Sequence, residues 1–338
     1  MTDRRALSEA FLARAGWGSA QRSFLAGDAS DRSYDRLRHG GQSAVLMDAP
    51  PGKGDDPADF VAMARHLTGL GLSAPAILAE DLEQGFLLLE DLGDGIFARV
   101  IAQDPLLEQP LYAAACDVLL HLHSAPPPHG LPDLSAQDWA EAAAFVLDWY
   151  RWGITDERID SRDFIACLRD LLACHADGPR IVILRDYHAE NLLWLPERQG
   201  LARVGLLDFQ LAQMGQPAYD LVSLLQDARR DVAIETETSI CARFRTATGQ
   251  TEVEFSAAYA VLGTQRALRI LGIFARLCLH GGKPGYLRLI PRVWQQLQRN
   301  LAHPALAPLA PLCARLLPDP TPEALARISA KCPTAPAP

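Results

Sequence analysis

Two apolar runs on either side of a short polar loop constrain the fold of this chain more than any other feature. The runs cover residues 181–184 and 204–207, and each has the length and composition of a short buried strand. The loop between them contains Asp186 and, five residues later, Asn191, and the second run ends at Asp208. A loop that follows a buried strand presents its side chains on a rigid frame. The segment is therefore expected to present two carboxylates and one amide as a set.

This set of groups fits the transfer of a phosphoryl group to a hydroxyl. Asp186 is the candidate base that orients the hydroxyl and accepts its proton. Asn191 and Asp208 are the candidate ligands of Mg²⁺, because amide and carboxylate oxygens suit that cation. Each residue alone is also typical of a turn or a cap, but all three in this order favour a kinase. His188 is a candidate contact of the transferring phosphate, with a bond to the loop backbone as the alternative.

The rest of the chain divides into a β-rich part and a helical part, so we expect an α+β fold with two lobes. Residues 1–92 predict a small nucleotide-binding lobe, and residues 93–303 a larger, mostly helical catalytic and substrate lobe. The small lobe is predicted to hold strands near 23–25, 34–38, 44–47, 77–80 and 86–90, with a helix at 59–70. The large lobe is predicted to hold helices at 108–123, 135–151, 161–175, 218–232, 253–280 and 284–301. Residues 304–338 form a Pro- and Ala-rich segment, expected to be disordered from Lys331 onward.

Two places in the small lobe predict contacts to a nucleotide. The turn from Gly27 through Ser30 to Arg32 offers backbone N–H groups and polar side chains that suit phosphates. Glu90 and Leu92 follow an apolar strand and lead into the second lobe, where adenine is expected to bond to backbone groups. ATP is therefore the expected phosphoryl donor.

Composition excludes several other classes of protein. The net charge of −9 argues against a nucleic-acid partner, which needs a basic surface. No apolar run approaches the roughly 20 residues of a membrane span, and the N-terminal residues lack the apolar core of a secretory signal. The seven cysteines are scattered without metal-site spacing, which indicates reduced thiols in a cytoplasmic protein. Oligomeric state is left open by the sequence.

At this point the chain resembles the aminoglycoside phosphotransferase and choline kinase-like superfamily, which shares the protein-kinase fold. The residues 186–191, Asp-Tyr-His-Ala-Glu-Asn, resemble its catalytic loop, and Leu207-Asp208-Phe209 its metal-binding strand. Residues 45–51, 86–94 and 271–276 are similar to the bacterial kinases that phosphorylate the anomeric hydroxyl of N-acetylmuramate and N-acetylglucosamine in cell-wall sugar recycling. The resemblance implies such a small sugar as the substrate, with ATP and Mg²⁺.

One departure from that fold is plain in the sequence. Kinases of this shape carry a Lys on the third strand and a Glu on the next helix, which together hold the α- and β-phosphates. Here residues 44–48 contain no Lys, and the helix at 59–70 contains no Glu. Arg32, Arg36 and Arg38 are the nearest cations, and Arg32 is the one predicted to contact phosphate.

The substrate leaves alternatives open. Arg266 and Arg269, with Arg276, are candidates to bind the lactyl carboxylate of N-acetylmuramate, although solvent-facing arginines look the same in sequence. A cationic substrate such as choline or an aminoglycoside would instead suit the negative charge and an aromatic cage from Trp149, Tyr150 or Trp152. The missing Lys and Glu also leave open a catalytically silent nucleotide-binding regulator.

Overall fold

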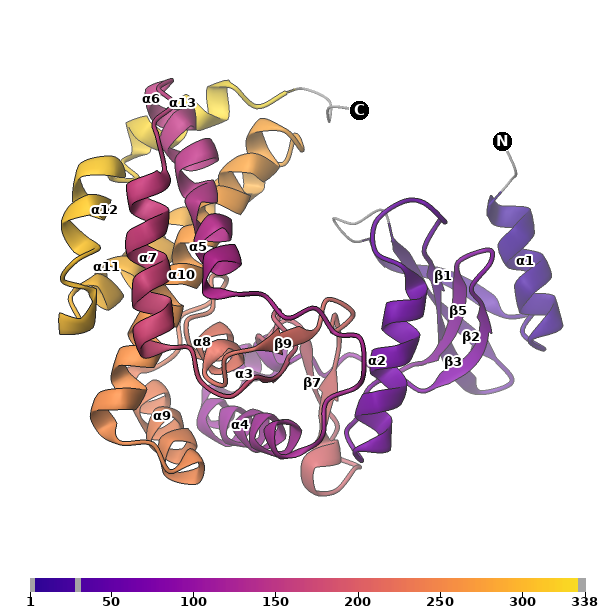
Figure 1. The fold of residues 1–338 in the computed structure, drawn as a ribbon. Helices are drawn as coiled ribbons and strands as arrows, with labels where there is room; N and C mark the ends of the chain where they lie inside the picture. Colours follow the sequence, from indigo (N-terminus) through magenta and orange to yellow (C-terminus); the bar gives the residue numbers. More distant parts are fainter. Residues whose placement is uncertain (1–3, 28–31, 334–338) are drawn as a thin grey trace. The chain divides into compact units, whose positions relative to one another are not determined.

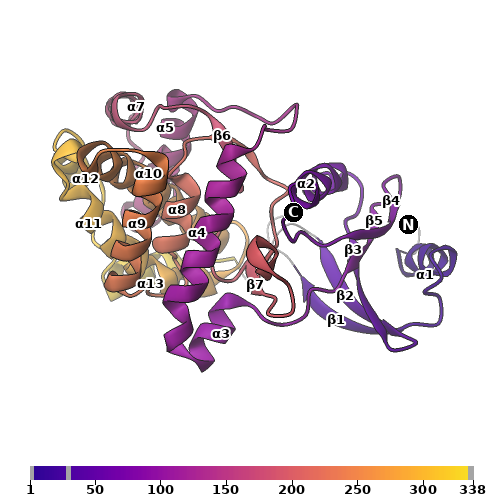
Figure 2. The ribbon, with the colours of Figure 1, turned by 90° about the horizontal axis from the view of Figure 1, so that it is seen from below.

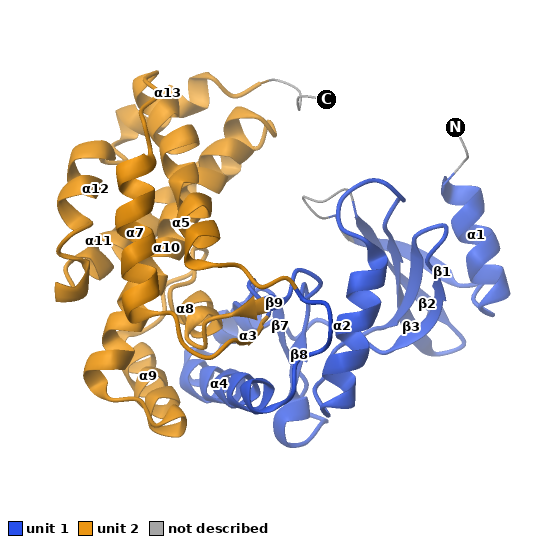
Figure 3. Cartoon of the chain, in the orientation of Figure 1, with its two compact units in different colours: residues 1–131, 184–213 blue, residues 132–183, 214–338 orange. Residues whose placement is uncertain are grey.

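The computed structural model describes residues 4–27 and 32–333, which form two compact units (Figure 3). Unit 1 contains residues 1–131 and 184–213, and unit 2 contains residues 132–183 and 214–338. The motif segment thus joins the N-terminal strands within unit 1. The division into lobes at residue 92, made from the change from strands to helices, stays a prediction.

Unit 1 is built around a five-stranded antiparallel sheet with the strand order β1-β2-β3-β5-β4 (Figures 1 and 2). The first part of the unit comprises α1 (Arg4–Arg14), β1 (Gln21–Gly27), β2 (Ser33–His39), β3 (Gln42–Asp48), α2 (Pro57–Gly69), β4 (Ile77–Asp81) and β5 (Phe86–Glu90). Helix α1 covers one face of the sheet, where Phe11 and Leu12 pack on Leu46 and Leu88. Asp56 starts α2 by accepting a hydrogen bond from the Ala58 N–H.

The two faces of β3 have separate neighbours because successive side chains of a strand alternate. Ala44 and Leu46 face the α1 side, in the cluster that contains Phe11. Val45 and Met47 therefore face the opposite side, where Val45 lines a pocket together with Phe60 of α2. Met47 is fully buried, so an apolar side chain fills the part of the strand where the fold usually has its Lys.

The second part of unit 1 connects this sheet to the catalytic loop. It comprises α3 (Phe97–Gln103), η1 (Pro105–Leu107), α4 (Glu108–Ser124), β7 (Leu192–Trp194), η3 (Gly200–Arg203) and β8 (Val204–Leu206). Strands β7 and β8 pair antiparallel, with Leu193 opposite Gly205. The Leu206 N–H donates to the Ser73 carbonyl, just after α2, so the hairpin is tied to the N-terminal half of the unit.

Unit 2 is mostly helical and is organised around one long helix, α10, of 28 residues. Thr251 and Glu254 form a capping box at its start, which satisfies N–H groups that a helix otherwise leaves unbonded. Buried residues of α10 lie in one large apolar cluster with those of α5, α7 and α11. The unit comprises α5 (Ala136–Phe145), η2 (Val146–Arg151), α6 (Trp152–Thr155), α7 (Arg162–His175), β6 (Ile181–Ile183), β9 (Gln213–Gly215), α8 (Tyr219–Leu225), α9 (Ile234–Thr248), α10 (Glu252–Leu279), η4 (Pro284–Leu289), α11 (Ile290–Leu301), η5 (Pro304–Leu306), α12 (Ala310–Leu316) and α13 (Pro322–Ala330).

Two expectations for unit 2 were wrong. The helix predicted at 218–232 ends at Leu225. The Asp227 carboxylate accepts the N–H of Arg229, and such local bonds compete with the helical pattern. The disorder expected from Lys331 onward is wrong at its first residue, where Lys331 forms an ion pair of 2.6 Å with Asp156; residues 334–338 of that stretch lie outside the described residues. The Pro-rich segment before it contains helices, because proline is well tolerated in the first helical turn, as at Pro322.

The predicted α+β class is confirmed by this arrangement of an antiparallel sheet and a larger set of helices. None of the helices in residues 4–27 and 32–333 combines the length and the apolar character that a bilayer crossing requires.

Candidate active site

The loop of residues 186–191, the predicted catalytic loop, is held in place by hydrogen bonds at its start. Arg185 has φ of 71°, in the left-handed region that few residues other than glycine adopt, and such strain is typical of functional sites. The next residue, Asp186, donates its backbone N–H to the Leu184 carbonyl at 2.9 Å. The Tyr187 hydroxyl donates to the Ala115 carbonyl of α4 at 2.9 Å, and this bond is buried. Asp186 therefore sits, half-buried, in a loop anchored on a helix.

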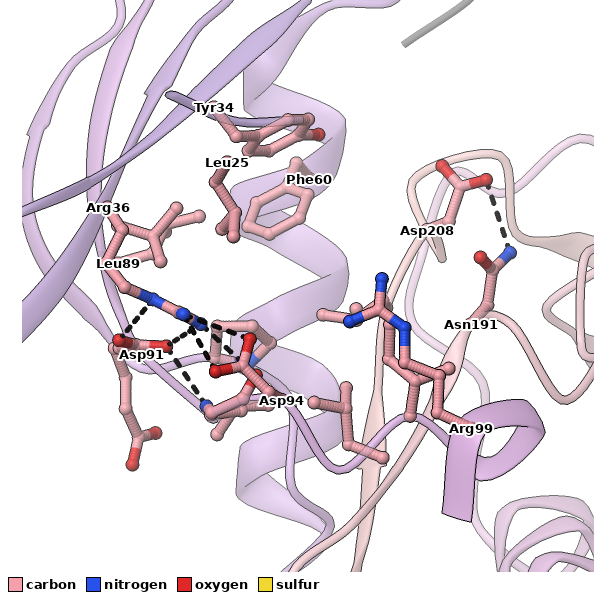
Figure 4. Close-up of a pocket in the computed structure, with 18 of the residues that line it drawn as sticks. Leu25, Tyr34, Arg36, Phe60, Leu89, Asp91, Asp94, Arg99, Asn191 and Asp208 are labelled. Carbon is pink, nitrogen blue, oxygen red and sulfur yellow. Dashed lines mark hydrogen bonds and ion pairs between the residues drawn. The ribbon is translucent and has the colours of Figure 1, made fainter. Parts of the chain in front are cut away.

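Asn191 and Asp208, the two predicted metal ligands, lie side by side (Figure 4). The Asn191 amide nitrogen donates to the Asp186 carbonyl at 2.9 Å and lies 3.4 Å from the Asp208 carboxylate. The Asp208 backbone also has a positive φ, of 57°, and its other carboxylate oxygen accepts from the Gln210 amide at 2.7 Å. One carboxylate and one amide oxygen are a common protein share of a Mg²⁺ site, where phosphates and water supply the rest. This donor set fits the cation.

His188 is buried within the same loop. Its Nε2 lies 3.5 Å from the amide nitrogen of Asn191, and its carbonyl accepts the Asn191 N–H at 2.9 Å. These contacts fit the structural alternative for His188. Its contact with a transferring phosphate stays a prediction.

Arg32 lies beside the candidate metal site. Its guanidinium is 3.5 Å from the Asp208 carboxylate and 3.4 Å from that of Asp55, and only 3% of its side chain is exposed. A buried cation between two carboxylates is placed to balance their charge. The predicted phosphate contact of Arg32 remains untested, and Ser30 lies outside the described residues.

A cavity of about 340 Å³ opens next to Asn191 and Asp208 within unit 1 (Figure 4). Its walls combine aliphatic and aromatic side chains with a few charged ones, as in many sites for small molecules. It includes the predicted residues Gly27, Glu90, Leu92, Asn191 and Asp208. Its other lining residues are Leu25, Tyr34, Arg36, Val45, Phe60, Pro75, Leu89, Asp91, Gly93, Asp94, Ile96, Arg99, Leu193 and Leu207.

Arg36 ties the sheet to the segment that follows β5. Its guanidinium bonds to the carboxylates of Asp91 and Asp94 at 2.9–3.0 Å. Burial alone would lower the pKa of Arg36, but the hydrogen bonds and charges of Asp94 and Asp91 outweigh burial and raise it. Sequence reasoning noted this Arg only as a nearby cation. The signal for the clamp was the pair of acids three residues apart after β5, although their partner is distant in sequence.

The backbone of Leu92 is open at this junction. None of the described residues forms a hydrogen bond with its N–H or carbonyl. The preceding Glu90 is held by Arg198 at 2.5 Å, and its N–H donates to the Ala76 carbonyl. Fixed neighbours and an open backbone are the conditions under which a planar base can be bound by main-chain groups.

The substrate residues predicted in α10 lie in unit 2 and differ in exposure. Arg266 is buried and donates to the Ser223 hydroxyl at 2.9 Å and to the Gln226 carbonyl at 3.2 Å. Arg269 is half-exposed, and the Arg276 guanidinium lies over the rings of Phe145 and Trp149. The contacts of Arg266 indicate a structural role, and substrate binding by either Arg266 or Arg269 stays a prediction.

The aromatic residues suggested as a cage for a cationic substrate are already occupied. Tyr150 is fully buried, and its hydroxyl donates to the Pro318 carbonyl at 2.7 Å. The Trp152 ring has the cations of Arg158 and Lys331 within 5.3 Å and 5.4 Å of its centroid. A choline-type cage at these residues is therefore not favoured.

Comparison with known proteins defines the class to which this fold and site belong. The model of the phosphotransferase enzyme family matches residues 21–256. The chain belongs to this family, which confirms the predicted small-molecule kinase and disfavours a silent regulator.

Individual relatives are also similar over nearly the whole chain. The N-acetylmuramate/N-acetylglucosamine kinase of Caulobacter vibrioides is 40% identical, over 94% of this chain and 98% of that protein. The enzyme of the same name from Pseudomonas aeruginosa is 34% identical, over 92% and 93%. Among solved structures, a choline/ethanolamine kinase family protein from Mesorhizobium loti superposes with a TM-score of 0.62 at 16% identity, over 97% and 100% of the two chains. At that identity the last comparison supports the fold alone.

Proposed function

We propose that this protein transfers the γ-phosphoryl group of ATP to the anomeric hydroxyl of N-acetylmuramate and N-acetylglucosamine. The observation that carries the proposal is 40% identity to a kinase of that name over 94% of the chain. The grouping of Asn191 and Asp208 next to the loop of Asp186 supports it.

Asp186 is assigned to the sugar hydroxyl. Its carboxylate orients the oxygen toward phosphorus and takes the proton as the new O–P bond forms and the bond to ADP breaks. An anomeric hydroxyl is more acidic than an ordinary alcohol, so a weak carboxylate base is adequate. Anchoring of the loop through Tyr187 supports this role, since positioning accounts for much of the rate in phosphoryl transfer.

Asn191 and Asp208 are assigned to Mg²⁺, which would neutralise charge on the phosphates. Leu92 is assigned to adenine through its open backbone, with Tyr34 and Phe60 in the same cavity as apolar neighbours. Gly27 and Arg32 remain the proposed phosphate contacts at the end of the first hairpin.

The cellular role follows from the chemistry. ATP is available in the cytoplasm, and all seven cysteines are free, as expected in a reducing compartment. We place the enzyme there, in the recycling of cell-wall amino sugars.

The test is phosphorylation with MgATP of N-acetylmuramate, N-acetylglucosamine, glucosamine, choline and kanamycin, followed by phosphorus NMR of the products. We expect a sugar 1-phosphate from the first two. Asp186→Asn should lower kcat by about 10³-fold, because a positioned acid–base group contributes roughly 10²–10⁴-fold. Asp163→Asn, an exposed Asp of α7, is the matched control and should leave kcat unchanged.

Each other outcome has a definite meaning. Phosphorylation of choline or kanamycin alone would keep the phosphotransferase and reject the sugar. Phosphate on a hydroxyl other than the anomeric one would reject the position of transfer. An unchanged kcat in Asp186→Asn would reject the base.

A further inference from the structure

Most charged groups that line the cavity in unit 1 already have a partner of opposite charge. Arg36 is bonded to Asp91 and Asp94, and Glu90 is bonded to Arg198. Arg99 is different, because none of the described residues forms a hydrogen bond or an ion pair with its exposed guanidinium. It is a cation in a cavity whose other charged groups have partners.

The position of Arg99 is fixed by the start of α3. Ile96, just before the helix, forms a bridge with Leu193, and the Ala98 N–H donates to the Ala189 carbonyl at 3.1 Å. Ala189 lies in the catalytic loop, between Asp186 and Asn191. The helix is thus bonded to the loop, and Figure 4 shows the Arg99 side chain extending from α3 into the cavity, between Asp94 and Asn191 in that view.

An exposed guanidinium without a partner among the described residues is available to an anion that enters the cavity. The cavity is lined by four carboxylates and two guanidinium groups, so a bound polyphosphate requires added positive charge. The usual source, a lysine on the third strand, is absent, because this face of β3 has Val45 in the cavity wall and the buried Met47 beside it. Guanidinium groups bind phosphate oxygens through paired N–H donors.

We propose that Arg99 binds the polyphosphate of the nucleotide from the α3 side of the cavity and replaces the missing strand lysine. The inference rests on the proposed nucleotide site. It is separate from the predicted phosphate contact of Arg32, whose guanidinium already lies 3.4 Å and 3.5 Å from the carboxylates of Asp55 and Asp208. The proposal assigns Arg99 to the phosphates and not to the base or the ribose.

The experiment compares the equilibrium binding of adenosine, ADP and ATP to the full-length protein by calorimetry. Arg99→Gln should weaken ADP and ATP by roughly tenfold or more, as expected for a charge-assisted hydrogen bond, and leave adenosine unchanged. Arg99→Lys should recover part of the loss, since it restores the charge without the paired donors. Arg65→Gln, at an exposed Arg of α2 paired with Glu80, is the control and should bind all three ligands like the wild type.

The outcomes separate this inference from the proposed function. An equal loss for adenosine and ADP, or no loss at all in Arg99→Gln, would reject the polyphosphate contact while the nucleotide site stands. Failure of the wild-type protein to bind any of the three would reject the nucleotide site itself, and the inference with it. Thermal unfolding of each variant separates lost contacts from lost folding.

Discussion

The predicted catalytic loop and the pocket face of the sheet, both in unit 1, differ in their polar content. The loop gathers carboxylates and an amide and holds them by backbone bonds, with positive φ at Arg185 and Asp208. The pocket face of β3 contains buried apolar side chains, Val45 and Met47, where the fold usually has a cation. The predicted functional groups thus lie in the loop, and the pocket face of β3 has none of them.

This difference teaches which groups the chemistry requires at fixed places. The proposed base and metal ligands would act directly on the reacting groups, so small displacements would be costly. A cation that holds the outer phosphates acts through charge, which falls off slowly with distance in a partly buried site. A phosphate-binding cation is therefore free to move to another element, such as α3, while Asp186, Asn191 and Asp208 are not.

The largest effect is expected from Asp208→Asn. Loss of the carboxylate removes the charged ligand proposed for Mg²⁺, and kcat should fall by about 10³-fold, in the range found when one group that stabilises the transition state is removed. Titration with Mg²⁺ at saturating ATP should show a raised requirement for the metal. Binding of adenosine should not change. An unaltered Mg²⁺ dependence would contradict the assignment of Asp208 to the metal.

Met47→Lys attempts to restore the usual lysine of the sheet. Met47 is fully buried, and α2 contains no Glu to receive the new charge, so the variant buries an unpaired ammonium. We expect the free energy of unfolding to fall by about 3 kcal/mol, measured by urea denaturation. Met47→Leu conserves shape and should cost less than about 1.5 kcal/mol. Tighter ADP binding in a stable Met47→Lys protein would show that the replacement of the lysine is incomplete.

The same contrast explains how much of this molecule the sequence reveals. The strands and helices of unit 1 follow from alternation and from caps such as Asp56, which are local signals. The motif residues were found because they are close in sequence, separated by five residues and by one hairpin. The clamp of Arg36 and the position of Arg99 depend on pairs far apart in the chain, which no local pattern encodes. Arg266 was proposed as a substrate contact from its charge and its place on the helix. The sequence does not show that its side chain is buried and bonded inside unit 2.

A smaller effect is expected from opening the Arg36 clamp. Arg36→Met leaves the Asp91 carboxylate, 7% exposed, with the Gly93 N–H but without its cation, and the loss of hydrogen bonds to a charged group costs roughly 1–3 kcal/mol. We expect about 2 kcal/mol less stability and a higher KM for ATP, because the segment that ends in Leu92 loses its tie to the sheet. Asp94→Asn is the comparison, since Asp94 is 65% exposed and its loss should cost less than about 1 kcal/mol. Equal losses of stability in the two variants would contradict a larger contribution from the buried Asp91 contact than from the exposed Asp94 contact.

The smallest effect concerns the helix that supports the catalytic loop. Burial lowers the pKa of His123 in α4 from its ordinary 6.5 to about 4. Between these values the unfolded chain binds a proton that the folded protein does not, so stability falls as the pH falls. At pH 5.5 this histidine should cost about 1.4 kcal/mol relative to neutral pH. His123→Gln should lose that part of the pH dependence in urea denaturation at pH 5.5 and 7.5, whereas His129→Gln, at an exposed position, should retain it. If His123→Gln keeps the full dependence, the acid sensitivity belongs to a group other than His123.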